Sequence, residues 1–257
     1  MENSWSTCDG ENETETQEIR NDIVSNGNSK IEPPRIYLFK DPAFRIRFLQ
    51  TLLILSVILW SIAVYSDFLE LKLLNDIKQG LFSSEEELAI TANASDTRQM
   101  ILGLGQGILA LTSFIFFMMW VHRSNNNIRA LTEESMEYTP GWAVGWFFIP
   151  ICALYKPYFV IKEIWIMCSK HSNLKRFSVV GLWWTFWLIS SCLSKLSTKL
   201  QLKAEDIDEL ITASFMSTIS GGIDIFAKIL MFMLISKIFL MQQEIRKQQM
   251  LNPTILP

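Results

Sequence analysis

The chain has 257 residues, of which 49% are hydrophobic, and its formal net charge is −3. Without an excess of basic residues it has no electrostatic footprint for nucleic acid, so nucleic-acid binding is excluded. Its two histidines and four cysteines form none of the usual metal-ligand spacings, and we expect neither a metal nor a cofactor.

Residues 1–33 form a polar, acidic segment in which the only basic residues are Arg20 and Lys30. A segment with so few apolar side chains cannot offset the entropy lost on ordering, so we predict a disordered acidic tail there. A multi-span membrane domain is predicted to follow at residues 34–247, with a short C-terminal tail at residues 248–257.

Residues 48–66 carry no charge, and a helix of this length spans the roughly 30 Å hydrocarbon core of a bilayer. Three further apolar runs lie at residues 100–121, 179–197 and about 211–236. The chain is therefore predicted to be an all-α integral membrane protein with four transmembrane helices, and the lipid bilayer is its first expected partner.

The segment between the first two spans, residues 67–99, is predicted to be helical and to form a cap outside the membrane. Its first part has apolar residues at near-helical spacing, and Ser83 or Ser84 with Glu86 or Glu87 three residues later is typical of a helix start. In the second span, Gly103 and Gly107 have the spacing of a close helix contact, across which Gln106 is able to form hydrogen bonds.

Residues 141–167 are apolar but interrupted by Pro150 and Pro157, which remove backbone donors. Cytoplasmic flanks carry the excess of Lys and Arg. This rule holds for every flank if the segment does not cross, and it then places both termini in the cytoplasm. We predict a re-entrant or interfacial helical element here, beside four crossings of a cell membrane.

Asp224 and Lys228 lie four residues apart near the centre of the last span, and so on one helix face. A charge at that depth is costly unless it is paired, which leaves two interpretations: an ion pair that fixes bundle geometry, or a site for an ion, proton or substrate. Gly221 and Gly222 precede the pair and either loosen the helix or admit a neighbour.

Three motifs stand out in the remaining sequence. They are W-x-x-R-x-x-x-N at Trp120, Arg123 and Asn127; a proline-containing block over residues 140–165 with Trp142, Pro150, Pro157 and Tyr158; and G-x-W-W-x-x-W over residues 181–187 with Trp183 and Trp184. In order and spacing these motifs resemble a bacterial membrane-protein family known as domain of unknown function 4328, over residues 45–245. The resemblance implies a multi-span domain of a bacterial inner membrane and brings no activity with it.

No catalytic motif names a nucleophile or an acid–base pair, so an enzyme is the least favoured function class. The first hypothesis is a non-enzymatic membrane component that assembles with a protein partner or with further copies of itself. The alternative is a small transporter or channel subunit, in which Asp224, Lys228 and Gln106 form an intramembrane polar site.

Overall fold

The computed structural model describes residues 37–251, apart from residue 133 and residues 175–177, so the tail predicted at residues 1–33 lies outside the described part. Every regular element in that part is helical, which confirms an all-α fold. In chain order they are α2 (Ala43–Lys78), α3 (Glu85–Thr132), α4 (Pro140–Gly145), the short 3-10 segments η1 (Trp146–Phe148) and η2 (Cys152–Leu154), α5 (Lys156–His171), α6 (Val180–Gln201) and α7 (Ile207–Leu251).

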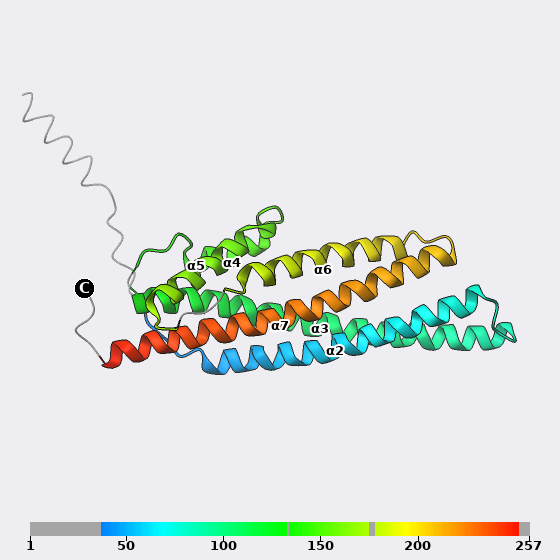
Figure 1. The fold of residues 1–257 in the computed structure, drawn as a ribbon, viewed down its shortest axis with the longest axis horizontal. Coiled ribbons are helices and arrows are strands. Elements are labelled where there is room, and N and C mark those ends of the chain that lie inside the picture. The colour runs from blue at the N-terminus through cyan, green and yellow to red at the C-terminus, as the bar shows by residue number, and fades with distance from the viewer. Residues whose placement is uncertain (1–36, 133, 175–177, 252–257) are drawn as a thin grey trace, which may run out of the picture. The chain divides into compact units, whose positions relative to one another are not determined.

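α2 and α3 form an antiparallel pair joined by a tight turn (Figure 1). Gly80 in this turn has φ +67°, a left-handed conformation that favours glycine. The backbone N–H of Glu87 donates to Ser84 Oγ at 3.2 Å, so the predicted helix start is present. Residues 67–99 are mostly helical, as predicted, but as continuations of α2 and α3 rather than as a separate cap.

By length and composition, α2 and α3 are the two helices of the described part that pass as candidate membrane spans. The other two predicted spans lie in α6 and α7, which carry more polar residues. α7 continues to Leu251, so the first residues of the predicted C-terminal tail belong to this helix.

The four long helices pack in the order α3, α2, α7, α6 (Figure 1). The α2–α3 turn and the α6–α7 turn lie at one end of this bundle, which we call the turn end. α4 and α5 pack at the opposite end, which we call the hairpin end.

The predicted break in residues 141–167 is confirmed. Helical structure stops at Phe148, and Ile149 takes the extended conformation favoured before a proline, with ψ 110°. The chain then returns through η2 and α5, where Glu163 accepts hydrogen bonds from the backbone N–H groups of Glu137 and Tyr138. The element is therefore a helical hairpin that begins and ends at the hairpin end of the bundle.

The buried residues differ between the two ends. At the hairpin end the core is aromatic and aliphatic, with Trp120, Ile164 and Ile235 at most 4% exposed. Towards the turn end the buried positions are small or polar, such as Ala213 and Ser214. Small side chains leave space between the helices, and that space forms the site described next.

Candidate functional site

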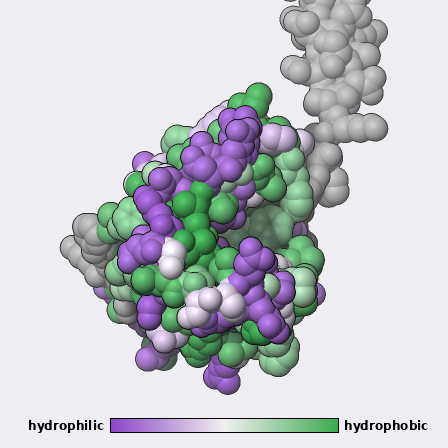
Figure 2. Space-filling model, turned by 90° about the vertical axis from the view of Figure 1, so that its right-hand side faces the viewer, coloured by the Kyte–Doolittle hydropathy of each residue, from purple (hydrophilic) through white to green (hydrophobic). Residues whose placement is uncertain are grey.

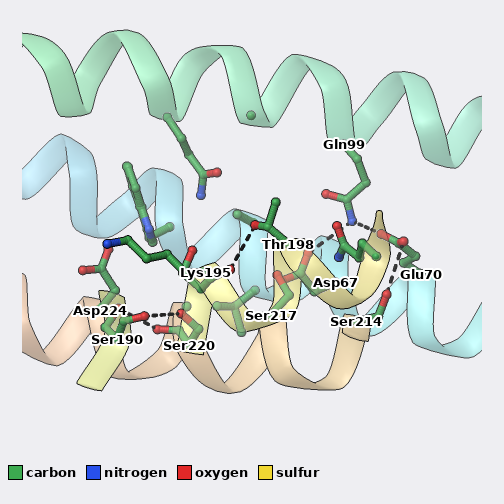
Figure 3. Close-up of a pocket in the computed structure, with 18 of the residues that line it drawn as sticks. Asp67, Glu70, Gln99, Ser190, Lys195, Thr198, Ser214, Ser217, Ser220 and Asp224 are labelled. Carbon is green, nitrogen blue, oxygen red and sulfur yellow. Dashed lines mark hydrogen bonds between the residues drawn. The ribbon is translucent and has the colours of Figure 1, made fainter. Parts of the chain in front are cut away.

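A cavity of about 800 Å³ lies between α2, α3, α6 and α7 in the half of the bundle nearest the turn end (Figure 3). Its lining is mainly polar, and among the described residues that line it are four carboxylates, Asp67, Glu70, Asp96 and Asp224, and one ammonium, Lys195. Viewed at the turn end, hydrophilic side chains gather in two clusters with a hollow between them (Figure 2).

Each helix supplies its lining residues from one face. The spacing of three and four residues repeats along α2 at Trp60, Ala63, Asp67 and Glu70, along α3 at Asp96, Gln99, Gly103 and Gln106, along α6 at Ser191, Ser194, Thr198 and Gln201, and along α7 at Ser214, Ser217, Gly221 and Asp224. This is the helical period. The sequence analysis singled out four of these positions, Gly103, Gln106, Gly221 and Asp224, and missed the rest. The signal that would have found them is this repeated polar spacing within otherwise apolar helices.

A hydrogen-bond network joins three helices near the turn end of the cavity. Gln99 on α3 donates to Asp67 Oδ1 at 3.2 Å and also to Glu70, both on α2. From α7, Ser217 donates to Asp67 Oδ2 and Ser214 donates to Glu70 Oε1, each at 3.3 Å. The two carboxylates thus accept hydrogen bonds from neutral donors on two other helices, and these bonds tie α2 to α3 and α7.

The predicted pair of Asp224 and Lys228 is present as an ion pair, and its two side chains are only 20% and 16% exposed. Asp224 lines the polar cavity, together with Gln106 from α3. The Lys228 Nζ lies 3.8 Å from the centre of the Trp60 ring, within the range of a cation–π interaction. Of the three predicted site residues, Asp224 and Gln106 therefore line the polar cavity, and Lys228 is held beside it by its ion pair with Asp224.

Beside Lys228 lies a second cavity of about 300 Å³, which Asp224 also lines. Aromatic rings dominate its described walls: Phe114, Phe117, Phe147, Trp183, Trp184 and Trp187. Lys195 on α6 extends along the larger cavity towards Asp224 (Figure 3).

The expectation for the glycines is wrong at Gly103 and Gly107 and confirmed at Gly221. The space beside Gly103 and Gly107 is open, so the predicted close contact does not form there; Gly105 instead faces Leu59 on α2, and a Cβ there would meet its side chain at 3.5 Å. Gly221 does admit a neighbour, because a Cβ on it would lie 2.9 Å from Val64 on α2.

Of the motif residues, Trp120, Trp183 and Trp184 are buried at the hairpin end. Phe117 joins them, with its ring centre 5.5 Å from that of Trp120 and 5.9 Å from that of Trp183. The indole N–H of Trp184 donates to the Leu154 carbonyl at 3.3 Å. We call Phe117, Trp120, Phe147, Trp183 and Trp184 the aromatic cluster.

The polar motif residues hold chain segments together. Asn127 donates to the Lys40 carbonyl at 3.1 Å and accepts from its N–H at 3.3 Å. Arg129, which the sequence analysis did not select, donates to Asn125 Oδ1, to the Met136 carbonyl and to the Tyr138 carbonyl at 2.9–3.0 Å. These bonds attach the start of the hairpin to α3.

Arg123 lies nearby and is partly buried. Desolvation, followed by the charge of Arg45, lowers the pKa of its guanidinium. Desolvation and then the charges of Arg123 and Arg45 lower the pKa of His122.

The remaining motif residues belong to the hairpin. Trp142 is 55% exposed, with its ring centre 5.0 Å from that of Trp146 and the two rings tilted, and Pro150 is exposed at the break. Pro157 is buried in the first turn of α5, where its missing N–H costs nothing, and the Lys162 ammonium lies over the Tyr158 ring. Burial of the Tyr138 side chain, just before α4, raises the pKa of its phenol to about 12.

A family model described as Domain of unknown function (DUF4328) matches residues 85–239. The chain belongs to the DUF4328 family. The match is shorter than the resemblance noted from the motifs: it begins with α3 and leaves out α2, which supplies Trp60, Asp67 and Glu70. Three of the four cavity walls thus lie in the DUF4328 region. No curated protein and no solved structure matches the chain.

Proposed function

We propose that this DUF4328 protein crosses a bacterial cell membrane four times and takes a small solute into its polar cavity from the extracytoplasmic side. The observation that carries the proposal is the cavity of about 800 Å³, lined by polar groups from all four long helices. It favours the transporter hypothesis over a partner-binding component, because an ion pair that only fixed the bundle would be buried away from such a space.

The outer surface of the bundle supports a membrane setting. Large apolar side chains are exposed along it, including Ile58 on α2, Ile108 on α3 and Phe226 on α7, each more than half exposed. Contact between water and apolar surface of this extent is unfavourable, whereas contact with lipid is not. Polar groups face inward and apolar groups outward, as expected where polar residues in spans line a water-filled cavity.

The packing of α7 against α2 and of α6 against α7 supports four crossings. α6 has 22 residues, which span about 33 Å at 1.5 Å per residue, enough for the hydrocarbon core. The residues that lower the apolar character of α6 and α7, such as Ser194, Lys195 and Asp224, line the cavity. Their polarity is therefore compatible with a crossing.

The orientation rests on charge. The hairpin end carries Arg45, Arg47, Arg123 and Lys170, while the turn end carries Glu85, Glu86 and Glu87 at the start of α3 and further acids at the α6–α7 turn. The excess of basic residues marks the cytoplasmic side. The hairpin is then re-entrant from the cytoplasm, both termini are cytoplasmic, and the cavity opens outward.

The aromatic cluster supports a carrier rather than an open channel. It occupies the bundle on the cytoplasmic side of the cavity, where Phe117 contacts Phe147 of the hairpin at 5.8 Å and Trp183 of α6 at 5.9 Å between ring centres. A solute that enters from outside thus meets a closed inner half, as in the outward-facing state of an alternating-access protein.

The experiment is cysteine accessibility on intact cells, in a chain whose native cysteines are replaced by alanine. Ser217→Cys in the cavity is expected to react with a charged, membrane-impermeant thiol reagent, whereas Leu104→Cys, which faces outward from α3, is not. Asn173→Cys after α5 is expected to react only after permeabilisation. A Ser217→Cys chain that is folded and unreactive contradicts the proposed cavity, and an Asn173→Cys chain that reacts on intact cells contradicts the topology.

A further inference from the structure

We propose that the junction of the two cavities recognises an organic cation, an ammonium group joined to an apolar body, and that Lys228 occupies the ammonium position until the ligand displaces it. This inference rests on the proposed function, because the ligand reaches the junction through the polar cavity. Asp224 lines both cavities and is the group they share.

The ammonium position is defined by the chain itself. The Lys228 Nζ pairs with the Asp224 carboxylate and lies 3.8 Å from the centre of the Trp60 ring. A carboxylate beside the face of a tryptophan is the combination that binds ammonium groups, by ion pairing on one side and cation–π attraction on the other. An ammonium brought by a ligand finds the same two partners.

The smaller cavity provides for the rest of the ligand. Its volume of about 300 Å³ and its walls of six aromatic side chains suit an aromatic or branched aliphatic group. Such a group gains by leaving water, whereas a fully hydrophilic solute would leave its polar groups unpaired there. The ligand is therefore amphipathic, with its charge at Asp224 and its apolar part against Trp183 and Phe117.

The charge of the polar cavity favours a positively charged ligand. Asp67, Glu70 and Asp96 line the route from the turn end to Asp224, and Lys195 is the one basic residue among the described lining residues. A cleft with an excess of one charge concentrates ligands of the opposite charge. An anion meets three carboxylates along this route against the ammonium of Lys195, so the route favours a cation.

Displacement of Lys228 gives the inference its most distinctive consequence. Two ammonium groups cannot both be neutralised by one carboxylate in a poorly hydrated site, so the ligand and Lys228 compete for Asp224. Removal of the Lys228 charge should therefore strengthen binding of a cation. If Lys228 instead contacted the ligand directly, as it would in an anion site, its removal would weaken binding.

The experiment measures binding to the full chain in lipid nanodiscs by calorimetry, with three probes of similar size: 2-phenylethylammonium, 2-phenylethanol and 3-phenylpropionate. We expect the ammonium to bind most tightly. Lys228→Met should tighten its binding about tenfold. Lys72→Met, a control at an exposed lysine of α2, should leave it unchanged.

Asp224→Asn should abolish ammonium binding. Because this change leaves Lys228 without its carboxylate, the double variant Asp224→Asn with Lys228→Met serves as a neutral, folded check and should also fail to bind. The inference is overturned if the alcohol or the carboxylate binds as well as the ammonium, or if Lys228→Met weakens ammonium binding. Absence of binding together with a reactive Ser217→Cys chain would reject the cation while leaving the cavity in place.

Discussion

The interior of the bundle is filled by different kinds of side chain at its two ends. At the hairpin end, large rings and aliphatic side chains fill the interior, and Asn127 and Gln242 attach segments far apart in sequence. At the turn end, serine and glycine leave a cavity that carboxylates and amides line. One half is therefore densely packed, and the other leaves space between its helices.

This difference teaches that the family motifs and the polar cavity occupy separate parts of the bundle. The motif residues Trp120 and Asn127 lie at the hairpin end, where they pack or hold the chain, and Trp183 and Trp184 line the smaller cavity rather than the polar one. The described residues that line the polar cavity belong to none of the three motifs. A motif search therefore finds the densely packed half first, and the polar lining emerges only when the helices are placed together.

The largest expected effect tests the dense packing of the hairpin end. Trp120→Ala removes a side chain that is 2% exposed and stacked on Phe117, and we expect a loss of about 3–5 kcal/mol in unfolding free energy. Trp142→Ala, at a tryptophan that is 55% exposed, should cost far less. Unfolding in mixed micelles measures both. Equal losses would mean that the hairpin end is not the densely packed half.

The next effect concerns the attachment of the hairpin. Arg129→Met leaves the carbonyls of Met136 and Tyr138 without their donor, so we expect a loss of about 2 kcal/mol. Faster hydrogen exchange should accompany it in residues 136–145. Arg47→Met, at an exposed arginine in α2, is the matched control and should leave exchange there unchanged. Protection that survives Arg129→Met would place the attachment elsewhere, for example at Glu163.

Much of the fold could be predicted from the sequence because its signals are local. Charge-free runs mark helices, Pro150 marks the break, and Ser84 with Glu87 marks a helix start. The Asp224–Lys228 pair was also predictable, since four residues separate its members on one helix.

The cavity and the role of Gly103 could not be predicted in the same way. A cavity depends on which faces of four helices meet, and a single helix shows only that it has a polar stripe. The same limit explains the wrong expectation for Gly103 and Gly107, which have the spacing of a contact face but lie beside open space. Small residues permit a close approach, and the neighbouring helix decides whether it happens.

A smaller effect tests how closely α2 and α7 approach each other beside the polar cavity, in the half that is less densely packed. Gly221→Ala would bring a Cβ to 2.9 Å from Val64, a stiff, branched side chain, so the helices must shift. Gly222→Ala has nothing within 4 Å and gains helix propensity of up to about 1 kcal/mol. We expect Gly222→Ala to unfold at a higher temperature than the parent chain and Gly221→Ala at a lower one. The reverse order would mean that α2 and α7 are not in close contact there.

The smallest expected effect lies at the exposed edge of the hairpin end. Glu134 bonds to Lys170 at 2.7 Å and to His171 at 2.7 Å, and the Lys170 ammonium, followed by His171, holds the pKa of this carboxyl below its usual value of 4.5. A lowered carboxyl pKa means that the stabilisation is fully present above pH 4.5 and is lost as the pH falls through the folded-state value.

Glu134→Gln should therefore lower the unfolding temperature slightly at pH 7, and the difference from the parent chain should vanish in acid, below pH 4.5. Because the group is exposed to solvent, salt should also reduce the difference. Thermal unfolding at several pH values and two salt concentrations measures both. A difference that persisted in acid and in salt would show that Glu134 acts by shape and hydrogen bonding rather than by charge, which would make this edge part of the tightly packed half.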